Sequence, residues 1–230
     1  MSNSLPSTCI PVPKIEEDGY DWYGRHDRIC KKCAEEKFDI AFIGDSITHY
    51  WQKEPDNGAD HGSEVWEEFY GKRKVLNMGY GFDRTQNVLW RLEHGELAGQ
   101  DPKFIVLHIG TNQYSGRKDP PADTAKGVLL IVEKLRTLCP SSQILLMAIF
   151  PRYEKKHEVR QLIEKVNTIL REELERKGDE KVTLVDLTNA LTDEKGELLE
   201  GAFRPCRTHL MPKGYRIWAE ALEKYFAGKV

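Results

Sequence analysis

The sequence predicts an α/β protein, a three-layer sandwich built on a five-stranded parallel sheet. Five short apolar runs occur along the chain without the polar alternation of a half-exposed strand. Such runs are typical of strands that are buried on both faces of a parallel sheet. Between them, apolar residues recur at the period of a helix, so strands and helices alternate. Right-handed crossovers then place helices on both faces of one sheet.

The elements can be assigned in chain order from this pattern. The apolar runs predict strands within residues 38–44, 74–79, 103–110, 143–150 and 181–187. Helical spacing is clearest in 128–138, in 159–170 and from about Pro212 onward. Residues 51–74 are rich in Asp, Asn, Gly and His, and they predict a loop with a short helix that covers a site.

The N-terminal residues differ in composition from the rest. Residues 1–35 begin with a proline-rich arm and continue into an aromatic and charged stretch that predicts a helix from about Trp22. We expect this arm and helix to pack on the core. Residues 36–230 are expected to form a single domain, which is long enough to bury a sizeable core.

Charge and hydrophobicity argue against a nucleic-acid-binding protein and against a membrane-spanning one. The 34 basic and 37 acidic residues are interspersed and give a net charge of -3, so no nucleic-acid partner is expected. No apolar run approaches the roughly 20 residues that cross a bilayer, and the first 13 residues contain no apolar signal core. We therefore expect no membrane span and a cytoplasmic location.

Five cysteines are an odd number and do not predict a disulfide framework. Cys30 and Cys33 form a C-x-x-C pair, which two interpretations fit. In one interpretation the pair binds zinc or takes part in a redox reaction. In the other it is simply two thiols on a helix. Because no second pair completes a metal site, we expect no metal.

The residues directly after the strands carry the chemical signal, because ligands of open parallel sheets bind at the carboxyl ends of the strands. Gly44-Asp45-Ser46 puts a hydroxyl on a tight turn from strand to helix, where the backbone N–H can meet an oxyanion. Residues 78–85 form a glycine turn that leads into a second helix, and 110–112 offer the amide of Asn112. His209 precedes Pro212, a residue suited to a first helical turn.

Each of these features alone has a structural explanation. Asp45 or Ser46 can cap the following helix, residues 110–112 can be an ordinary turn, and His209 can be a surface histidine. Their occurrence together, each at a predicted strand end or helix start, favours nucleophilic catalysis by Ser46.

These segments resemble the four sequence blocks of the SGNH (GDSL-like) hydrolases, and the resemblance covers nearly the whole chain. Residues 83–97, DRTQNVLWRLEHGEL, are similar to the branch that contains platelet-activating-factor acetylhydrolase catalytic subunits and bacterial acetylesterases. The resemblance implies a flavodoxin-like fold and hydrolysis of a small-molecule ester without metal or organic cofactor. It also makes a homodimer plausible.

The resemblance assigns roles position by position. Ser46 attacks the ester carbonyl, and His209 accepts its proton as general base. The oxyanion is held by the Ser46 N–H, by the Asn112 side chain and by the N–H of Phe82, where the family usually has glycine. Phe82 does not adopt glycine's positive φ cheaply, so the adjacent Gly81 is an alternative donor.

Cys206 is the larger departure, since the family has an aspartate three residues before the histidine. A neutral thiol is a poor hydrogen-bond acceptor, and in another serine hydrolase replacing the acid by its amide lowered turnover about ten-thousand-fold. Three explanations stay open: an engineered substitution, a Ser-His dyad oriented by a backbone carbonyl, or another acid such as Asp193 or Glu200. A Cys206 nucleophile would leave Ser46 unexplained.

The expected function is removal of short acyl groups, acetyl above all, from a carbohydrate or lipid-like alcohol. A lysophospholipase or thioesterase is the nearest alternative. A rival from another class is a catalytically impaired ester-binding or sugar-binding protein. A nucleotide-binding protein is poorly supported because no P-loop occurs. The predicted pocket residues are Asp45, His49, Tyr80, Tyr114 and Phe150.

Overall fold

The computed structural model describes residues 4–14, 19–53 and 60–230. Its centre is a five-stranded sheet with the order β2-β1-β3-β4-β5, and every neighbouring pair is parallel. The strands are β1 (Ile40–Gly44), β2 (Val75–Gly79), β3 (Phe104–His108), β4 (Gln143–Met147) and β5 (Val182–Val185). The predicted α/β fold and its five strands are confirmed.

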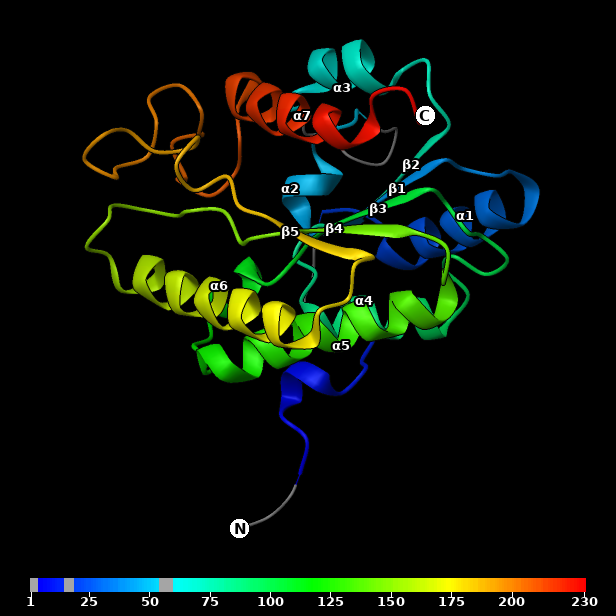
Figure 1. Ribbon diagram of the computed structural model, residues 1–230, viewed down its shortest axis with the longest axis horizontal. Coiled ribbons are helices and arrows are strands. Elements are labelled where there is room, and N and C mark those ends of the chain that lie inside the picture. Colours follow the sequence, from blue (N-terminus) through cyan, green and yellow to red (C-terminus); the bar gives the residue numbers. More distant parts are fainter. Residues whose placement is uncertain (1–3, 15–18, 54–59) are drawn as a thin grey trace.

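Helices cover both faces of the sheet (Figure 1). On one face the core is formed with α1 (Trp22–Glu35), α4 (Thr85–Glu93), α5 (Pro121–Leu138) and α6 (Glu158–Lys177). On the other face it is formed with α2 (Ser46–His49), α3 (Ser63–Tyr70) and α7 (Pro212–Phe226). Two hydrophobic cores therefore hold the sheet between them, as a three-layer sandwich requires.

The register of the strands brings three loops to one edge of the sheet. Gly44, the last residue of β1, is paired with Gly79 of β2 and with His108 of β3. The segments that follow these three strands therefore start side by side. The strand order changes direction at β1 and β3, which is the place where ligands bind in sheets of this topology.

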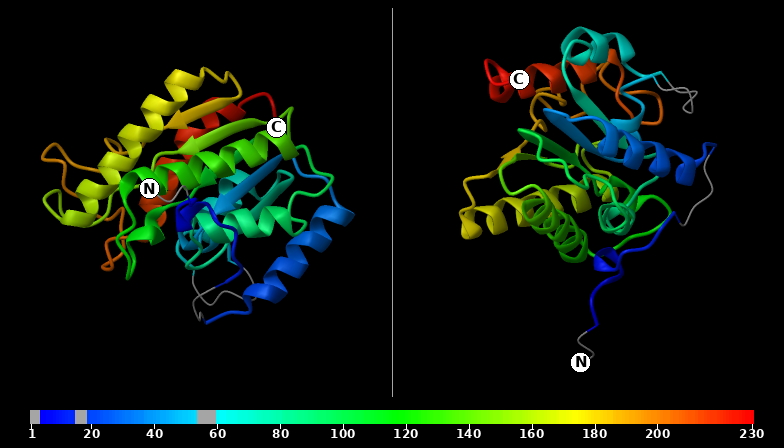
Figure 2. Two further views of the ribbon diagram at one scale, coloured as in Figure 1. Left: turned by 90° about the horizontal axis from the view of Figure 1, so that it is seen from below. Right: turned by 90° about the vertical axis from the view of Figure 1, so that its right-hand side faces the viewer.

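The N-terminal arm lies against the helical layer of α4 and α5 (Figure 2). Its short helix η1 (Ser7–Cys9) is fixed by the Thr85 hydroxyl, which donates to the Thr8 carbonyl over 2.8 Å. A side chain on Gly127 would meet the same carbonyl at 2.7 Å, so the absence of a side chain there permits the contact. The helix predicted from about Trp22 begins at that residue.

The region 51–74 contains the predicted short helix, α3, whereas residues 54–59 lie outside the described part of the chain. Within the described ranges, no helix has the length and apolar character needed to cross a bilayer.

Candidate active site

Ser46 lies at the start of α2, directly after β1. Asp45 is the N-cap of this helix, and its Oδ1 accepts the Ile47 N–H over 2.9 Å. The fold brings Ser46 to His209, which lies in the loop before α7: Ser46 Oγ is 2.9 Å from His209 Nε2. Tyr215 of α7 also donates its hydroxyl to the carbonyl of Ile47 over 2.7 Å, so the helix after His209 is bonded to the helix that carries Ser46.

His209 has an environment that disfavours its charged form. Burial lowers the pKa of His209 to about 4, and the charges of Arg152 and Arg204 act in the same direction. The ring is therefore neutral at pH 7 and Nε2 is able to take a proton. This requires the ring proton to be on Nδ1, a tautomer inferred from the hydrogen bonds.

The neighbour of His209 Nδ1 is Cys206, whose Sγ lies 3.3 Å away. Cys206 is therefore the side chain that contacts the Nδ1 side of the imidazole. Among the described residues, neither alternative acid has a hydrogen bond or ion pair with His209. Asp193 accepts the N–H groups of Lys195 and Glu197 within its own turn.

The backbone donors differ in their availability. The Ser46 N–H is in the first turn of α2 and has no acceptor inside the helix. The Phe82 N–H also has no acceptor among the described residues. The Gly81 N–H, in contrast, donates to His49 Nδ1 over 3.2 Å. This bond corrects the expectation that Gly81 is an alternative oxyanion donor.

The Asn112 amide is fixed to the same turn. Its Nδ2 donates to the Asp83 carbonyl over 3.0 Å, which uses one of its two hydrogens. Arg84 holds the Asn112 main chain, because its Nε donates to the Asn112 carbonyl over 3.0 Å. The loops after β2 and β3 are therefore tied together at the edge where Ser46 lies.

Phe82 itself is unusual in conformation and exposure. Its φ is 59°, in the left-handed region, and its side chain is 48% exposed. The predicted difficulty of a positive φ at this residue is thus present in the fold.

All five of the predicted pocket residues are buried. The Tyr80 hydroxyl donates to Glu96 over 2.6 Å, and that of Tyr114 donates to Thr124 over 3.2 Å. Phe150 packs on His108 and on Trp218, with ring centroids 4.1 and 5.0 Å apart. His49 and Asp45 are fully buried as well. Position after a strand did not tell which way each side chain points.

The buried pair Asp45 and His49 has shifted pKa values. Burial raises the pKa of Asp45 to about 7, although the Ile47 N–H opposes the shift. Burial lowers the pKa of His49 to about 2, so its ring is neutral and Nδ1 can accept the Gly81 N–H. Both residues support the backbone of the site.

Two aromatic residues beside His209 were missed by the sequence analysis. The rings of Tyr50 and His61 lie 5.5 and 5.4 Å from that of His209. Tyr50 directly follows α2, so its place in the first motif was an available signal. His61 follows no strand, and its only signal was its place within residues 51–74, the segment predicted to cover a site.

Cys30 and Cys33 lie on α1, away from this edge, and Cys33 is buried. Cys30 Sγ contacts the ring of His26 at 3.7 Å. In the described part of the chain, no group of three or more His, Cys, Asp or Glu side chains is arranged to hold a metal ion.

Comparison with known proteins agrees with this geometry. Residues 42–217 match the model of the GDSL-like lipase/acylhydrolase family, and that span includes both Ser46 and His209. The chain belongs to this family. The chain is 32% identical over 195 residues to the platelet-activating factor acetylhydrolase IB subunit alpha2 of Homo sapiens, covering 84% of this chain and 79% of the relative.

Solved structures show the same fold for this chain. A GDSL-like lipase from Bacteroides thetaiotaomicron has a TM-score of 0.69 at 15% identity and covers 88% of this chain and 97% of its own. A catalytic mutant of an acetylxylan esterase from Geobacillus stearothermophilus has a TM-score of 0.64 at 19% identity, with coverage of 84% and 95%. At these identities the likeness concerns the fold.

Proposed function

We propose that this acylhydrolase is a serine esterase that removes short acyl groups, acetyl in particular, from a carbohydrate or lipid-like alcohol. The observation that carries the proposal is the 2.9 Å contact between Ser46 Oγ and His209 Nε2. A neutral imidazole at that distance is placed to act as general base for the hydroxyl. The names of the acetylhydrolase relative and of the acetylxylan esterase neighbour support acetyl as the acyl group.

The reaction then runs in two halves. Ser46 Oγ forms a bond to the ester carbonyl carbon while its proton passes to His209 Nε2, and the carbonyl oxygen becomes an oxyanion. The oxyanion accepts hydrogen bonds from the N–H groups of Ser46 and Phe82 and from the Asn112 amide. The alcohol leaves with the proton from His209. Water repeats the sequence on the acyl-enzyme and releases the acid.

Cys206 is proposed to orient the imidazole. The Nδ1–H of His209 donates to its sulfur, which fixes the tautomer that presents Nε2 to Ser46. A neutral sulfur stabilises the imidazolium less than a carboxylate does, so we propose an enzyme weaker than one with aspartate at this position. The proposed chemistry uses no metal or organic cofactor. The cytoplasmic location and the homodimer stay predictions.

The direct test is hydrolysis of p-nitrophenyl acetate and p-nitrophenyl octanoate, with Ser46→Ala as the blank. We expect turnover of the acetate to exceed that of the octanoate and to vanish in Ser46→Ala. Turnover that persists in this variant would reject Ser46 as nucleophile. A preference for octanoate would reject the short acyl group and favour a lipase.

An ester-binding protein without catalysis is the second candidate, and the thiol at the acid position is the observation in its favour. A fluorophosphonate probe separates the two candidates, because it labels only an activated serine. Labelling at Ser46, identified by mass spectrometry of the peptide, supports the esterase. An unlabelled but folded protein supports the binder.

A further inference from the structure

Phe82 holds a conformation that an L residue with a side chain rarely adopts. Such a conformation persists where contacts with the surrounding residues contribute more free energy than the strained backbone costs. The N–H of this residue is one of the proposed oxyanion donors, so the groups that fix its backbone bear on catalysis. The N-terminal segment supplies two of them.

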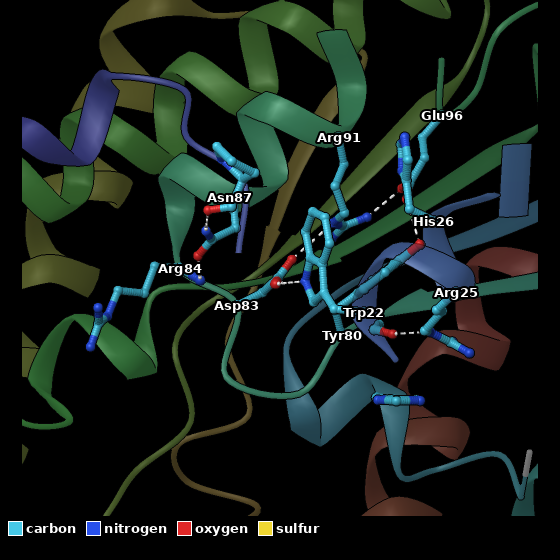
Figure 3. Close-up of polar contacts among 12 residues, drawn as sticks. Trp22, Arg25, His26, Tyr80, Asp83, Arg84, Asn87, Arg91 and Glu96 are labelled. Atoms are coloured by element: carbon cyan, nitrogen blue, oxygen red, sulfur yellow. Dashed lines mark hydrogen bonds and ion pairs between the residues drawn. The ribbon is translucent and has the colours of Figure 1, made fainter. Parts of the chain in front are cut away.

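Tyr20, which lies two residues before α1, and Trp22, the first residue of α1, hold the turn on both sides of Phe82. The Tyr20 hydroxyl donates to the Gly81 carbonyl over 3.3 Å. The Trp22 Nε1–H donates to Asp83 Oδ1 over 2.8 Å (Figure 3). Trp22 and Asp83 are 61 positions apart and both are buried, so the contact crosses from the N-terminal helix to the loop after β2.

Asp83 is also part of a series of buried polar contacts that begins and ends on α1. Arg91 Nε donates to Asp83 Oδ2 over 2.8 Å, and Arg91 also pairs with Glu96. Glu96 Oε1 lies 3.1 Å from His26 Nδ1. His26 is four residues after Trp22 and therefore lies on the same face of α1. In Figure 3 the series of contacts begins at Trp22 and ends at His26, which both belong to this helix.

The same aspartate supports a second oxyanion donor. Its main-chain carbonyl accepts the Asn112 Nδ2–H over 3.0 Å, and Asp83 is the residue directly after Phe82 in the chain. A shift of Asp83 would therefore displace both the Phe82 N–H and the Asn112 amide. Donors must stand within a few tenths of an ångström of the developing charge to stabilise it fully.

We propose that Trp22, helped by Tyr20, is a positioning residue for the oxyanion donors, so that α1 is a working part of the catalytic unit. The inference rests on the proposed serine-esterase function. If these contacts only fastened α1 to the core, their loss would lower stability without a selective effect on turnover. If they position the donors, their loss lowers kcat and leaves KM nearly unchanged, because the oxyanion exists only after attack.

The decisive variant is Trp22→Phe, which keeps an aromatic ring and removes the N–H donor. Its matched control is Trp218→Phe, because Trp218 is equally buried and its Nε1 has no hydrogen-bond partner among the described residues. Both variants create a similar cavity. With p-nitrophenyl acetate we expect Trp22→Phe to lower kcat about tenfold at constant KM. We expect Trp218→Phe to retain kcat within about twofold.

Tyr20→Phe provides a second variant that decides the matter if Trp22→Phe does not fold. It deletes one partly buried hydroxyl, and Tyr23→Phe on the exposed side of α1 is its control. We expect Tyr20→Phe to lower kcat about threefold and to slow labelling of Ser46 by a fluorophosphonate to the same degree, since that reaction also builds charge on an oxygen in the oxyanion hole.

The outcomes separate the inference from the function on which it rests. Wild-type turnover that disappears in Ser46→Ala, combined with wild-type kcat in folded Trp22→Phe or Tyr20→Phe, would overturn the inference alone. Equal losses of kcat in Trp22→Phe and Trp218→Phe would also overturn it. Turnover independent of Ser46 would overturn the proposed function first.

Discussion

At the scale of single residues, the proposed function makes the pair His209 and Cys206 decisive for the strength of the catalyst. His209 is partly buried, lies near two arginines, and has a sulfur where a carboxylate would offset those charges. The proposed base is therefore deprotonated over a wide pH range, but its protonated form is poorly stabilised. These two properties act in opposite directions on turnover, and each can be measured.

The pH profile of the wild-type enzyme reports the first property. Because burial lowers the pKa of His209 to about 4, kcat/KM for p-nitrophenyl acetate should rise through pH about 4 and be level by pH 6. The rate with Ser46→Ala is subtracted at each pH. An acidic limb centred at pH 6.5 or above would mean that the imidazolium is stabilised by a group we have not identified.

Cys206→Asp reports the second property. A carboxylate beside Nδ1 stabilises the imidazolium, which raises the pKa of His209 and moves the acidic limb to higher pH. It should also raise kcat at pH 8 by at least about tenfold. Cys206→Asn is the control, because asparagine has the shape of aspartate without its charge. If Asp and Asn variants gave the same kcat, the missing charge would not limit this enzyme.

At the scale of elements, helix α2 depends on the close approach of two backbones. A Cβ on Gly79, the last residue of β2, would lie 2.2 Å from the His49 nitrogen of α2. No rotation of a side chain relieves a clash with backbone. The glycine therefore sets the distance between β2 and the helix that carries Ser46.

Gly79→Ala should consequently push α2 away from the sheet. We expect it to lower the free energy of unfolding by about 3 kcal/mol, at the upper end of overpacking effects. It should also lower kcat, since α2 carries Ser46. Urea unfolding followed by tryptophan fluorescence measures the first effect. Gly19→Ala, where a Cβ meets nothing within 4 Å, is expected to match the wild type. A Gly79→Ala protein of wild-type stability would contradict the argument.

Elements were predictable from the sequence to the extent that their pattern is local. Continuous apolar runs gave the five strands, and the approach of Ser46 to His209 followed from the motifs and the edge they share. The direction of side chains after each strand was not predictable, which is why Tyr80 was expected in the pocket but lies in the core. The contact of Trp22 with Asp83 joins distant segments, and no local pattern marks it.

At the scale of the whole molecule, buried titratable groups make stability depend on pH. Burial lowers the pKa of four histidines, to about 2 for His49, about 3 for His108 and about 4 for His61 and His209. The unfolded chain binds these protons near pH 6.5, so the folded state loses stability as the pH falls below that value.

Two buried carboxyls oppose this trend. Burial raises the pKa of Asp45 to about 7 and that of Asp83 to about 6. Their folded forms keep protons that the unfolded chain releases, so their contribution favours the folded state as pH falls from 7 toward 4. Against the effect of burial, hydrogen bonds to Cys30 and Glu96 raise the pKa of His26 to about 10, so His26 acts in the same direction as the two carboxyls. Because four histidines oppose these three groups, acidification should destabilise the protein on balance.

We therefore expect the urea midpoint at pH 5 to lie below that at pH 7.5. His108 has only burial acting on its pKa, which makes His108→Gln the clearest variant. It should reduce the change in free energy between the two pH values, because one proton fewer is taken up on unfolding. A midpoint that is higher at pH 5 would show that His26 and the two carboxyls dominate.

The order of the chain also matters for synthesis on the ribosome. Ser46 and His209 are separated by 163 positions, and the histidine comes just before the final helix, which is bonded to α2 through Tyr215. A growing polypeptide whose last segment is still inside the ribosome contains Ser46 but cannot yet bring His209 to it. Under the proposed function, the nascent chain is therefore expected to be inert toward esters until His209 and α7 have left the ribosome.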